Sequence, residues 1–349
     1  MPGSDRIPIV SLHDVRGPLD HRRDLGDRVT EVFHDIGFLI VVEHGVDPAL
    51  VDDVFASMER FFALDEDAKA LIDKRRSPHF RGWEAVGSEC TNGRRDVREQ
   101  IDLWTEWPAR SGGPTHHRLL GPNQWLSDDL LPGHRELMGR WFSELGALAD
   151  RLLALLSLGL GLEEDHLRRL FGAEPMSLVK LIHYPPTPAG GAGVNAHHDT
   201  GFLTVLAPGP TPGLQVEEPD GSWVDVPSVP GSFVVNLGEM LQHLTGNYLV
   251  ATPHRVVTDR ERLSAGYFHG PSLDAPLDPL PLGPHLAAAV TASPRHRDAG
   301  VMARREETRA GVGDMQGRHR PATYGEQLWN YFVRSYPDNV ARHYPELVS

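Results

Sequence analysis

The sequence predicts a mixed α and β fold, with a double-stranded β-helix (jelly roll) core flanked by N-terminal and supporting helices. Three observations predict this class. A helix–strand–helix pattern occupies the N-terminal region, a leucine-rich helical pattern covers residues 141–158, and from residue 178 onward short strand patterns alternate with turn signals. Helices that precede a run of short strands favour a closed β core with helical support.

The N-terminal region has the pattern of a structural scaffold. Residues 7–12 (Ile-Pro-Ile-Val-Ser-Leu) predict a short edge strand, where the missing donor of proline is tolerated. A helix is predicted next, because apolar residues recur there on a single helical stripe: Leu25, Val29, Val32, Phe33 and Ile36. The apolar run 38–42 predicts a second strand, and Asp47 followed by Pro48 predicts the start of a helix that reaches Phe62.

The middle of the chain contains an irregular segment and then a long helix. Residues 77–121 are polar and contain scattered tryptophans and carboxylates, which either line a pocket or anchor the loop itself. Residues 141–158 predict a helix that supports a sheet, and its apolar face consists of Leu145, Leu148, Leu152, Leu155 and Leu156.

Six short strands are predicted in the second half of the chain, at residues 178–184, 202–206, 214–217, 223–226, 233–236 and 263–269. The segment Pro219-Asp220-Gly221-Ser222 supplies a hairpin turn between two of them. A jelly roll is the most economical closed form for about eight such strands. We therefore assign the core with the candidate site to residues 175–272.

The whole chain, residues 1–349, is predicted to form one domain. Residues 1–120 form its N-terminal region of helices and strands. Residues 275–320 are rich in proline, alanine and arginine, and they predict a solvated surface insertion with one short helix rather than a lid. Residues 321–349 contain apolar positions at helical spacing and predict a C-terminal helix that docks on the body.

The composition excludes several classes of function. A net charge of -14 gives no indication of nucleic-acid binding, which requires a basic patch. Cys90 is the only cysteine, so an intrachain disulfide is excluded and a cytoplasmic location is expected. No secretory signal or membrane-spanning stretch is predicted. The expected partner is a small-molecule substrate, with no nucleic acid or membrane, and a monomer is a plausible state.

A candidate metal site is formed by two histidines and an aspartate. His197 and Asp199 stand two residues apart, so on a strand their side chains project to the same face. A jelly roll can bring His254 to the same edge. Two imidazoles and a carboxylate form the facial triad of non-haem Fe(II) oxygenases, which leaves positions for a co-substrate and dioxygen. Zinc hydrolases use the same donor types, so these residues alone leave the metal open.

Arg262 and Ser264 favour an oxygenase. At alternate positions of a strand they point the same way, and a guanidinium beside a hydroxyl can bind a carboxylate. A dicarboxylate such as 2-oxoglutarate can chelate iron at its keto-acid end and have its far carboxylate held by this pair. A hydrolase does not need this second anchor.

The chain resembles the isopenicillin N synthase-like family of Fe(II)/2-oxoglutarate oxygenases over nearly its full length. The matching motifs are Ile-Pro-Ile-Val, Ile36-Gly37-Phe38, Glu43-His44-Gly45, His197-x-Asp199, Gly201-Phe202-Leu203-Thr204, Val235-Asn236-Leu237-Gly238-Glu239, His254-Arg255-Val256 and Arg262-x-Ser264. The resemblance implies that His197, Asp199 and His254 are the catalytic, metal-binding residues. It also implies that Arg262, Ser264 and Tyr184 bind 2-oxoglutarate.

Within that family, the chain looks most similar to bacterial members of the ethylene-forming enzyme type. The shared motifs are Gly82-Trp83, Glu89-x-Thr91, Thr252-Pro253-His254, Ala265-Gly266-Tyr267-Phe268-His269, Tyr324-Gly325-Glu326 and Arg334-Ser335-Tyr336-Pro337-Asp338. The resemblance implies that Glu89, Thr91 and Arg334 contact an arginine-like substrate, while the alternative is that Glu89 and Arg334 are ordinary surface charges. Thr200 replaces an aromatic residue beside the iron ligand, so ethylene formation itself is not expected.

The predicted function is an Fe(II)- and 2-oxoglutarate-dependent dioxygenase that oxidises an unactivated C–H bond of a small molecule. Hydroxylation is the default outcome, while desaturation and ring closure stay open. An amino acid or amino acid derivative of secondary metabolism is the expected substrate class. Two alternatives stay open at this point: a non-haem iron oxidase that does not use 2-oxoglutarate, and a jelly-roll binding protein with a vestigial metal site.

Overall fold

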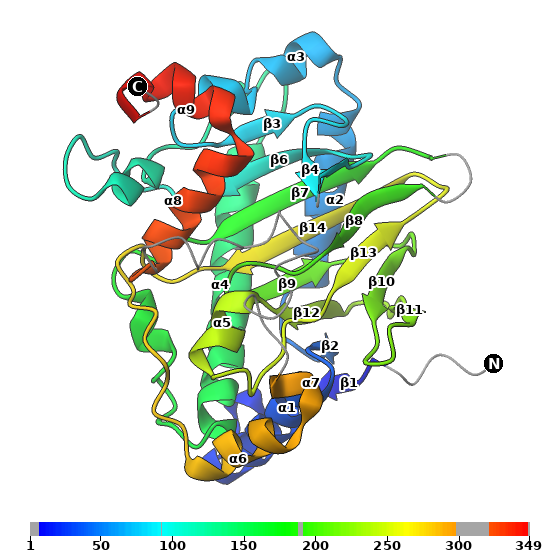
Figure 1. The fold of residues 1–349 in the computed structure, drawn as a ribbon. Coiled ribbons are helices and arrows are strands. Elements are labelled where there is room, and N and C mark those ends of the chain that lie inside the picture. The colour runs from blue at the N-terminus through cyan, green and yellow to red at the C-terminus, as the bar shows by residue number, and fades with distance from the viewer. Residues whose placement is uncertain (1–6, 92, 188–190, 298–320, 348–349) are drawn as a thin grey trace.

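The computed structural model describes residues 7–91, 93–187, 191–297 and 321–347. A large β-sheet has long helices on one face and a smaller sheet on the other face (Figure 1). The α-helices are α1 (Leu19–Asp35), α2 (Pro48–Phe62), α3 (Glu66–Ala70), α4 (His134–Gly159), α5 (Glu239–Leu244), α6 (Pro284–Ala292), α7 (Pro294–Arg297), α8 (Tyr324–Ser335) and α9 (Pro337–His343).

The strands are β1 (Ile9–Ser11), β2 (Phe38–Val42), β3 (Gly82–Glu84), β4 (Cys90–Thr91), β5 (Arg94–Arg95), β6 (Glu99–Trp104), β7 (Leu178–Tyr184), β8 (Ala192–His197), β9 (Leu203–Ala207), β10 (Leu214–Glu217), β11 (Trp223–Asp225), β12 (Phe233–Leu237), β13 (His254–Val257) and β14 (Arg262–His269). Short 3-10 turns cover His13–Arg16, Lys74–Arg76, Thr115–Leu119, Arg168–Phe171 and Pro345–Leu347.

The large sheet has the strand order β1-β2-β12-β9-β14-β7-β6-β3, and the small sheet has the order β11-β10-β13-β8. Along this order, the edge pair β1–β2 of the large sheet is parallel. The six neighbouring pairs that follow it are antiparallel. The two sheets pack face to face through an apolar layer that includes Ile40, Ile182, Val216 and Val256. This arrangement confirms the predicted mixed fold with a jelly-roll core.

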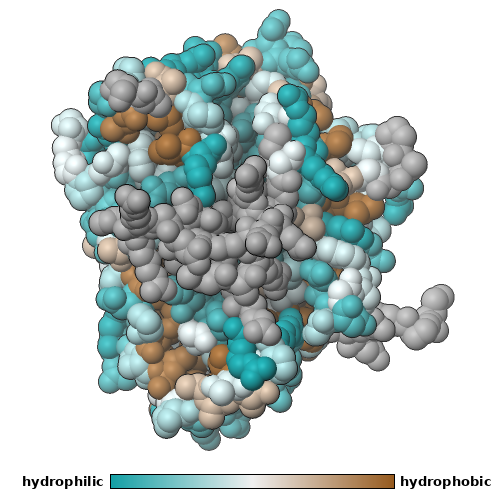
Figure 2. All heavy atoms as spheres, in the orientation of Figure 1, coloured by the Kyte–Doolittle hydropathy of each residue, from teal (hydrophilic) through white to brown (hydrophobic). Residues whose placement is uncertain are grey.

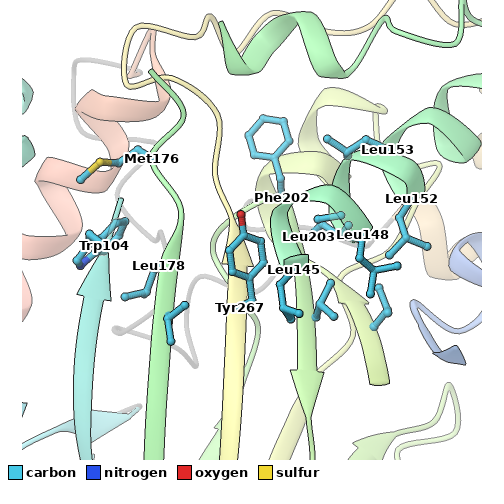
Figure 3. Close-up of a cluster of buried hydrophobic side chains, with 14 of the residues drawn as sticks. Trp104, Leu145, Leu148, Leu152, Leu153, Met176, Leu178, Phe202, Leu203 and Tyr267 are labelled. Carbon is cyan, nitrogen blue, oxygen red and sulfur yellow. The ribbon is translucent and has the colours of Figure 1, made fainter. Parts of the chain in front are cut away.

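The other face of the large sheet is covered mainly by α1, α2 and α4. Helix α4 places an unbroken apolar stripe against the strands, and Figure 3 shows Leu145, Leu148 and Leu152 beside Leu203 and Tyr267 of the sheet. These five side chains are at most 3% exposed. Burial of each leucine contributes about 1.5–3 kcal/mol, so α4 stabilises the sheet on which the site is built.

The long helix, the N-terminal scaffold and the C-terminal helix lie where the sequence predicts them, although α4 begins seven residues earlier, at His134. Two further strands of the core, β8 and β13, join the six predicted ones. The hairpin turn is present between β10 and β11, where Glu218 N–H donates to Ser222 O over 2.8 Å.

Two predictions about the fold need correction. Residues 77–121 are not simply irregular, because β6 lies inside this segment and pairs with β7 in the large sheet. The insertion at residues 275–320 contains two short helices, α6 and α7, in its described part. Residues 298–320 of that insertion lie outside the described residues. The division of the domain into regions stays a prediction.

Among the coloured residues of the face drawn in Figure 2, hydrophilic side chains predominate and the apolar ones form separate groups. In the described part of the chain, six large apolar side chains are exposed: Ile9, Leu19, Leu71, Val86, Leu130 and Leu347. No helix in these residues combines the length and the hydropathy required to cross a bilayer.

Candidate active site

The two histidines of the candidate metal site are brought together by strand pairing in the small sheet. His197 ends β8, His254 begins β13, and the two residues are cross-strand partners. Asp199 Oδ1 lies 3.8 Å from His197 Nε2 and 3.6 Å from His254 Nε2. The three donor atoms lie within 4.8 Å of one another, so a single cation can contact all of them.

Asp199 differs from the expected placement on one strand with His197. Strand β8 ends at His197, and Asp199 lies in the loop that leads to β9. The loop is fixed by main-chain hydrogen bonds, since Glu239 N–H donates to Asp199 O over 2.8 Å. The carboxylate therefore reaches the two imidazoles through a turn rather than through strand alternation.

Backbone carbonyls set the tautomers of both imidazoles. His197 Nδ1–H donates to Asn195 O over 2.9 Å, and His254 Nδ1–H donates to Thr252 O over 3.2 Å. With its proton on Nδ1, a neutral imidazole keeps the lone pair on Nε2 for a metal. Burial and the neighbouring His254 lower the pKa of His197 to about 3, so this ring is neutral at pH 7.

The carboxylate of Asp199 is oriented by two residues that the sequence analysis did not assign a role. Asp199 Oδ2 accepts hydrogen bonds from Thr204 Oγ1 over 2.6 Å and from Asn236 Nδ2 over 2.7 Å. Its other oxygen, Oδ1, remains directed at the imidazoles. Both residues lie in motifs shared with the resembled family, Gly201-Phe202-Leu203-Thr204 and Val235-Asn236, but these motifs do not indicate which side chain their polar residues contact.

A second group of potential metal ligands in the described residues consists of His116, His117 and Asp274. Here the imidazole Nε2 atoms lie 2.8 and 2.9 Å from Asp274 Oδ1, which is the distance of direct hydrogen bonds. The spacing of 3.6 and 3.8 Å at Asp199 is instead too long for hydrogen bonds and suits ligands around a shared cation. The group around Asp199 is therefore the better candidate for a metal site.

A cavity of about 460 Å³ adjoins this group and is bordered by Asp199, His254, Arg262 and Ser264. Arg262 and Ser264 lie on β14 and are 2% and 1% exposed. Two atoms of the Arg262 guanidinium donate to backbone oxygens of Pro208 and Thr211. In the described part of the chain, the third nitrogen, Nη1, and the hydroxyl of Ser264 have no hydrogen-bond partner.

Tyr184 is the cross-strand partner of Arg262, and the guanidinium carbon lies 4.9 Å from the centre of its ring. The tyrosine also borders the cavity. Burial lowers the pKa of Arg262 from its usual value, but an arginine remains protonated at neutral pH. The cavity thus contains a fixed, buried positive charge near the His–Asp–His group.

These residues fit an Fe(II) ion and 2-oxoglutarate. Imidazole nitrogens and a carboxylate oxygen are suitable donors for Fe(II). Leaving a guanidinium N–H and a hydroxyl buried without partners costs about 1–3 kcal/mol each, and a carboxylate can accept hydrogen bonds from both. The distal carboxylate of 2-oxoglutarate supplies such an acceptor.

The three residues expected to contact the substrate also border the cavity. Glu89 already accepts a hydrogen bond from Arg98 Nη2 over 2.7 Å, and Thr91 donates to Asp96 Oδ2 over 2.6 Å. Arg334 lies on α8 and is exposed. The structure therefore brings all three to the cavity, but it gives Glu89 and Thr91 partners within the protein.

Comparison with known families divides the chain into two matching parts. Residues 7–128 match the family described as non-haem dioxygenase in morphine synthesis N-terminal. Residues 175–271 match the 2OG-Fe(II) oxygenase superfamily. The second match contains the His–Asp–His group as well as Arg262 and Ser264.

Individual relatives and structures extend the similarity to most of the chain. The 2-oxoglutarate-dependent dioxygenase frbJ from Dothideomycetidae sp. (strain 11243) is 31% identical over 99% of this chain and 94% of its own length. Homoarginine-6-hydroxylase 2-ODD-C23.2 from Arabidopsis thaliana is 29% identical over 80% of each chain. The crystal structure of JOX2 with 2OG, Fe and JA is 30% identical, covers 79% of this chain and 78% of its own, and has a TM-score of 0.66.

Proposed function

The chain belongs to the 2OG-Fe(II) oxygenase superfamily, and we propose that it hydroxylates an unactivated C–H bond of an amino acid or amino acid derivative. The enzyme is an Fe(II)- and 2-oxoglutarate-dependent dioxygenase. The observation that carries the proposal is the pair of unpartnered polar groups on Arg262 and Ser264, in the same cavity as the His–Asp–His group. An oxidase that works without 2-oxoglutarate, or a vestigial site, has no use for that buried pair.

His197, Asp199 and His254 would hold Fe(II), and Arg262, Ser264 and Tyr184 would hold 2-oxoglutarate. The metal and co-substrate supply the oxidising chemistry, in which dioxygen is consumed and succinate and carbon dioxide are formed. The chain supplies ligand orientation, a buried cation for the distal carboxylate and a cavity that limits the access of water. Desaturation and ring closure are the other outcomes that the same chemistry permits.

The proposed substrate class rests on similarity and on the charges around the cavity. One relative is named as a homoarginine hydroxylase, and the sequence motifs resemble those of ethylene-forming enzyme-type members. Arg334, which is exposed at the edge of the cavity, would pair with a substrate carboxylate. Glu89 and Thr91, which also border the cavity, would contribute further polar contacts. Thr200, where those members carry an aromatic residue, argues against ethylene formation.

The co-substrate assignment can be tested by direct binding. We expect Arg262→Gln to weaken 2-oxoglutarate binding by at least about tenfold, because it removes a charge-assisted hydrogen bond in a buried site. Calorimetry on the Fe(II)-loaded protein without oxygen measures this affinity. The exposed Arg260→Gln provides a matched control on the preceding loop and should bind 2-oxoglutarate as the unaltered protein does.

The reaction itself is tested by succinate release with a set of free amino acids, including basic ones. A stimulation of succinate release by one of them, accompanied by a hydroxylated product, supports the proposal. An unchanged 2-oxoglutarate affinity in Arg262→Gln contradicts the co-substrate site. If none of the amino acids stimulates succinate release, the proposed substrate class is wrong.

A further inference from the structure

One wall of the active-site cavity contains buried polar atoms that have no partner in the described part of the chain. Asp102 and Trp104 lie at alternate positions of β6, so both side chains project to the same face of the sheet, and both border the cavity. They are 2% and 4% exposed. Asp102 Oδ1 and Trp104 Nε1 are buried without a hydrogen-bond partner.

The position of these atoms points to a ligand. A buried carboxylate oxygen or indole N–H without a partner costs about 1–3 kcal/mol, and most such groups in proteins are satisfied. The remaining contacts of Asp102 are made by its other oxygen, which accepts from Lys74 over 2.7 Å and from Lys180 over 3.2 Å. Asp102 Oδ1 and Trp104 Nε1 thus leave one acceptor and one donor unused on two residues that border the cavity.

Asp102 belongs to a connected network of buried charges. In order of contact, the network consists of Glu84–Lys74–Asp102–Lys180–Glu89–Arg98–Asp96. Each side chain is at most 14% exposed. The network contains four carboxylates and three cationic groups, so it holds one more negative than positive charge when all are ionised.

An excess of negative charge in a buried network is unfavourable until a cation or a proton balances it. In the free protein, burial raises the pKa of Glu84, which is one way to reduce the excess. A bound cation is the other way. Glu89 is less available than Asp102 for that cation, because its carboxylate already pairs with Arg98 at 2.7 Å and lies 3.7 Å from Lys180.

We propose that β6 is the substrate-recognition strand, with Asp102 binding a cationic nitrogen and Trp104 donating a hydrogen bond to an oxygen of the same molecule. The proposal rests on the proposed function, since it takes the cavity to be the place where the substrate is oxidised. The substrate class is a basic amino acid, whose side chain carries an ammonium or guanidinium group and whose carboxylate offers acceptor oxygens. Asp102 and Trp104 determine specificity in this scheme.

The test compares pairs of ligands that have nearly the same shape and differ in charge. L-arginine is compared with L-citrulline, and L-lysine with L-norleucine, by calorimetry on the full chain loaded with Fe(II) and 2-oxoglutarate without oxygen. We expect at least one cationic ligand to bind about tenfold or more tightly than its neutral partner, as a charge-assisted hydrogen bond predicts. Equal binding within each pair, or no binding of any of the four ligands, overturns the proposal.

Variants assign the preference to the two residues. Asp102→Asn should remove most of the preference for the cationic ligand, whereas Trp104→Phe should weaken both members of a pair and keep their ratio. Glu106→Gln makes the same kind of change at an exposed position just beyond β6 and should leave the preference unchanged. A preference that survives Asp102→Asn contradicts the assignment.

Binding of 2-oxoglutarate to each variant separates the possible failures. A variant that binds 2-oxoglutarate like the unaltered protein has an intact site, so its ligand preference can be interpreted. If the unaltered protein binds 2-oxoglutarate and releases succinate but shows no cation preference, the inference about β6 is wrong while the proposed function stands. If it binds no 2-oxoglutarate, the proposed function itself is wrong.

Discussion

At the scale of the single residue, the two oxygens of Asp199 have different tasks. Oδ1 faces the two imidazoles, while Oδ2 accepts hydrogen bonds from Thr204 and Asn236. Outer contacts of this kind hold a ligand in one orientation and maintain its charge. Although burial raises the pKa of Asp199, the neighbouring imidazoles and these hydrogen bonds hold it below its ordinary value.

Removing these outer hydrogen bonds should weaken metal binding. We expect Thr204→Val, which keeps the shape of the side chain, and Asn236→Leu each to lower Fe(II) affinity by about 10–100-fold. Competition with a chelator measures the affinity. Thr291→Val on the exposed part of α6 removes a comparable threonine hydrogen bond and should leave the affinity unchanged. Equal Fe(II) affinities in all three variants would show that metal binding does not depend on the hydrogen bonds to Asp199 Oδ2.

Residue types and spacing alone predict five cavity residues as ligands of the metal or the co-substrate. His197, Asp199, His254, Arg262 and Ser264 are recognisable because metal and carboxylate binding require particular side chains at particular separations. The partners of Asp199 could not be assigned in this way, because Thr204 and Asn236 reach it through the pairing of β9 with β12. That register places Asn236 opposite Thr204 and is set by the packing of the whole sheet.

At the scale of the element, β6 shows why a strand can be missed in the sequence. All six of its residues are buried, yet the sequence Glu-Gln-Ile-Asp-Leu-Trp contains three polar side chains. Asp102 borders the cavity and Gln100 donates to Glu84 over 2.9 Å, while Glu99 binds Lys69 on the other face of the strand. Because buried charged partners surround the polar side chains of β6, the strand lacks the alternation of apolar and polar residues by which strands are recognised.

The N-terminus of α4 provides a prediction about pH. His134 is the first residue of α4, is 6% exposed and shares a 2.9 Å hydrogen bond with Ser57. Burial, together with the nearby Arg60, lowers its pKa to about 4, and a positive charge at a helix N-terminus is unfavourable as well. The unfolded chain therefore binds a proton at a higher pH, near 6.5, than the folded chain does.

This difference makes the folded state less stable as pH falls from about 6.5 to about 4. Between pH 7 and pH 4.5 the histidine should account for a loss of about 2–3 kcal/mol. His134→Gln should lose correspondingly less stability over that range in chemical denaturation. The exposed His21→Gln should follow the unaltered protein. Parallel pH profiles for His134→Gln and the unaltered protein would contradict the assigned pKa.

At the scale of the whole molecule, the sequence predicted the layers but not their connections. The apolar stripes of α1, α2 and α4 and the short apolar strands identify which elements form the core. The order of strands in the large sheet depends on long-range pairing, such as β12 between β2 and β9, which no local pattern encodes. The buried charge network likewise joins residues 74, 84, 102 and 180, which are distant in the sequence.

Lys74 connects this network to the C-terminal helices. Its ammonium group contacts Glu84, lies 2.7 Å from Asp102 and donates to Tyr336 Oη over 3.1 Å. The lysine is 2% exposed. Because Tyr336 separates α8 from α9, the contact ties the end of the chain to β3 and β6.

We expect Lys74→Met, which keeps most of the side-chain volume, to lower the free energy of unfolding by about 3–5 kcal/mol, because it leaves two buried carboxylates without their shared cation. The loss should shrink as pH falls, since a proton on Glu84, whose pKa burial already raises, replaces part of the missing charge. Chemical denaturation at several pH values measures both effects. Arg110→Ala, which breaks the half-exposed pair with Glu174, should cost less than about 1 kcal/mol. A similar cost for Lys74→Met would mean that the network contributes little to holding the C-terminal helices on the sheet.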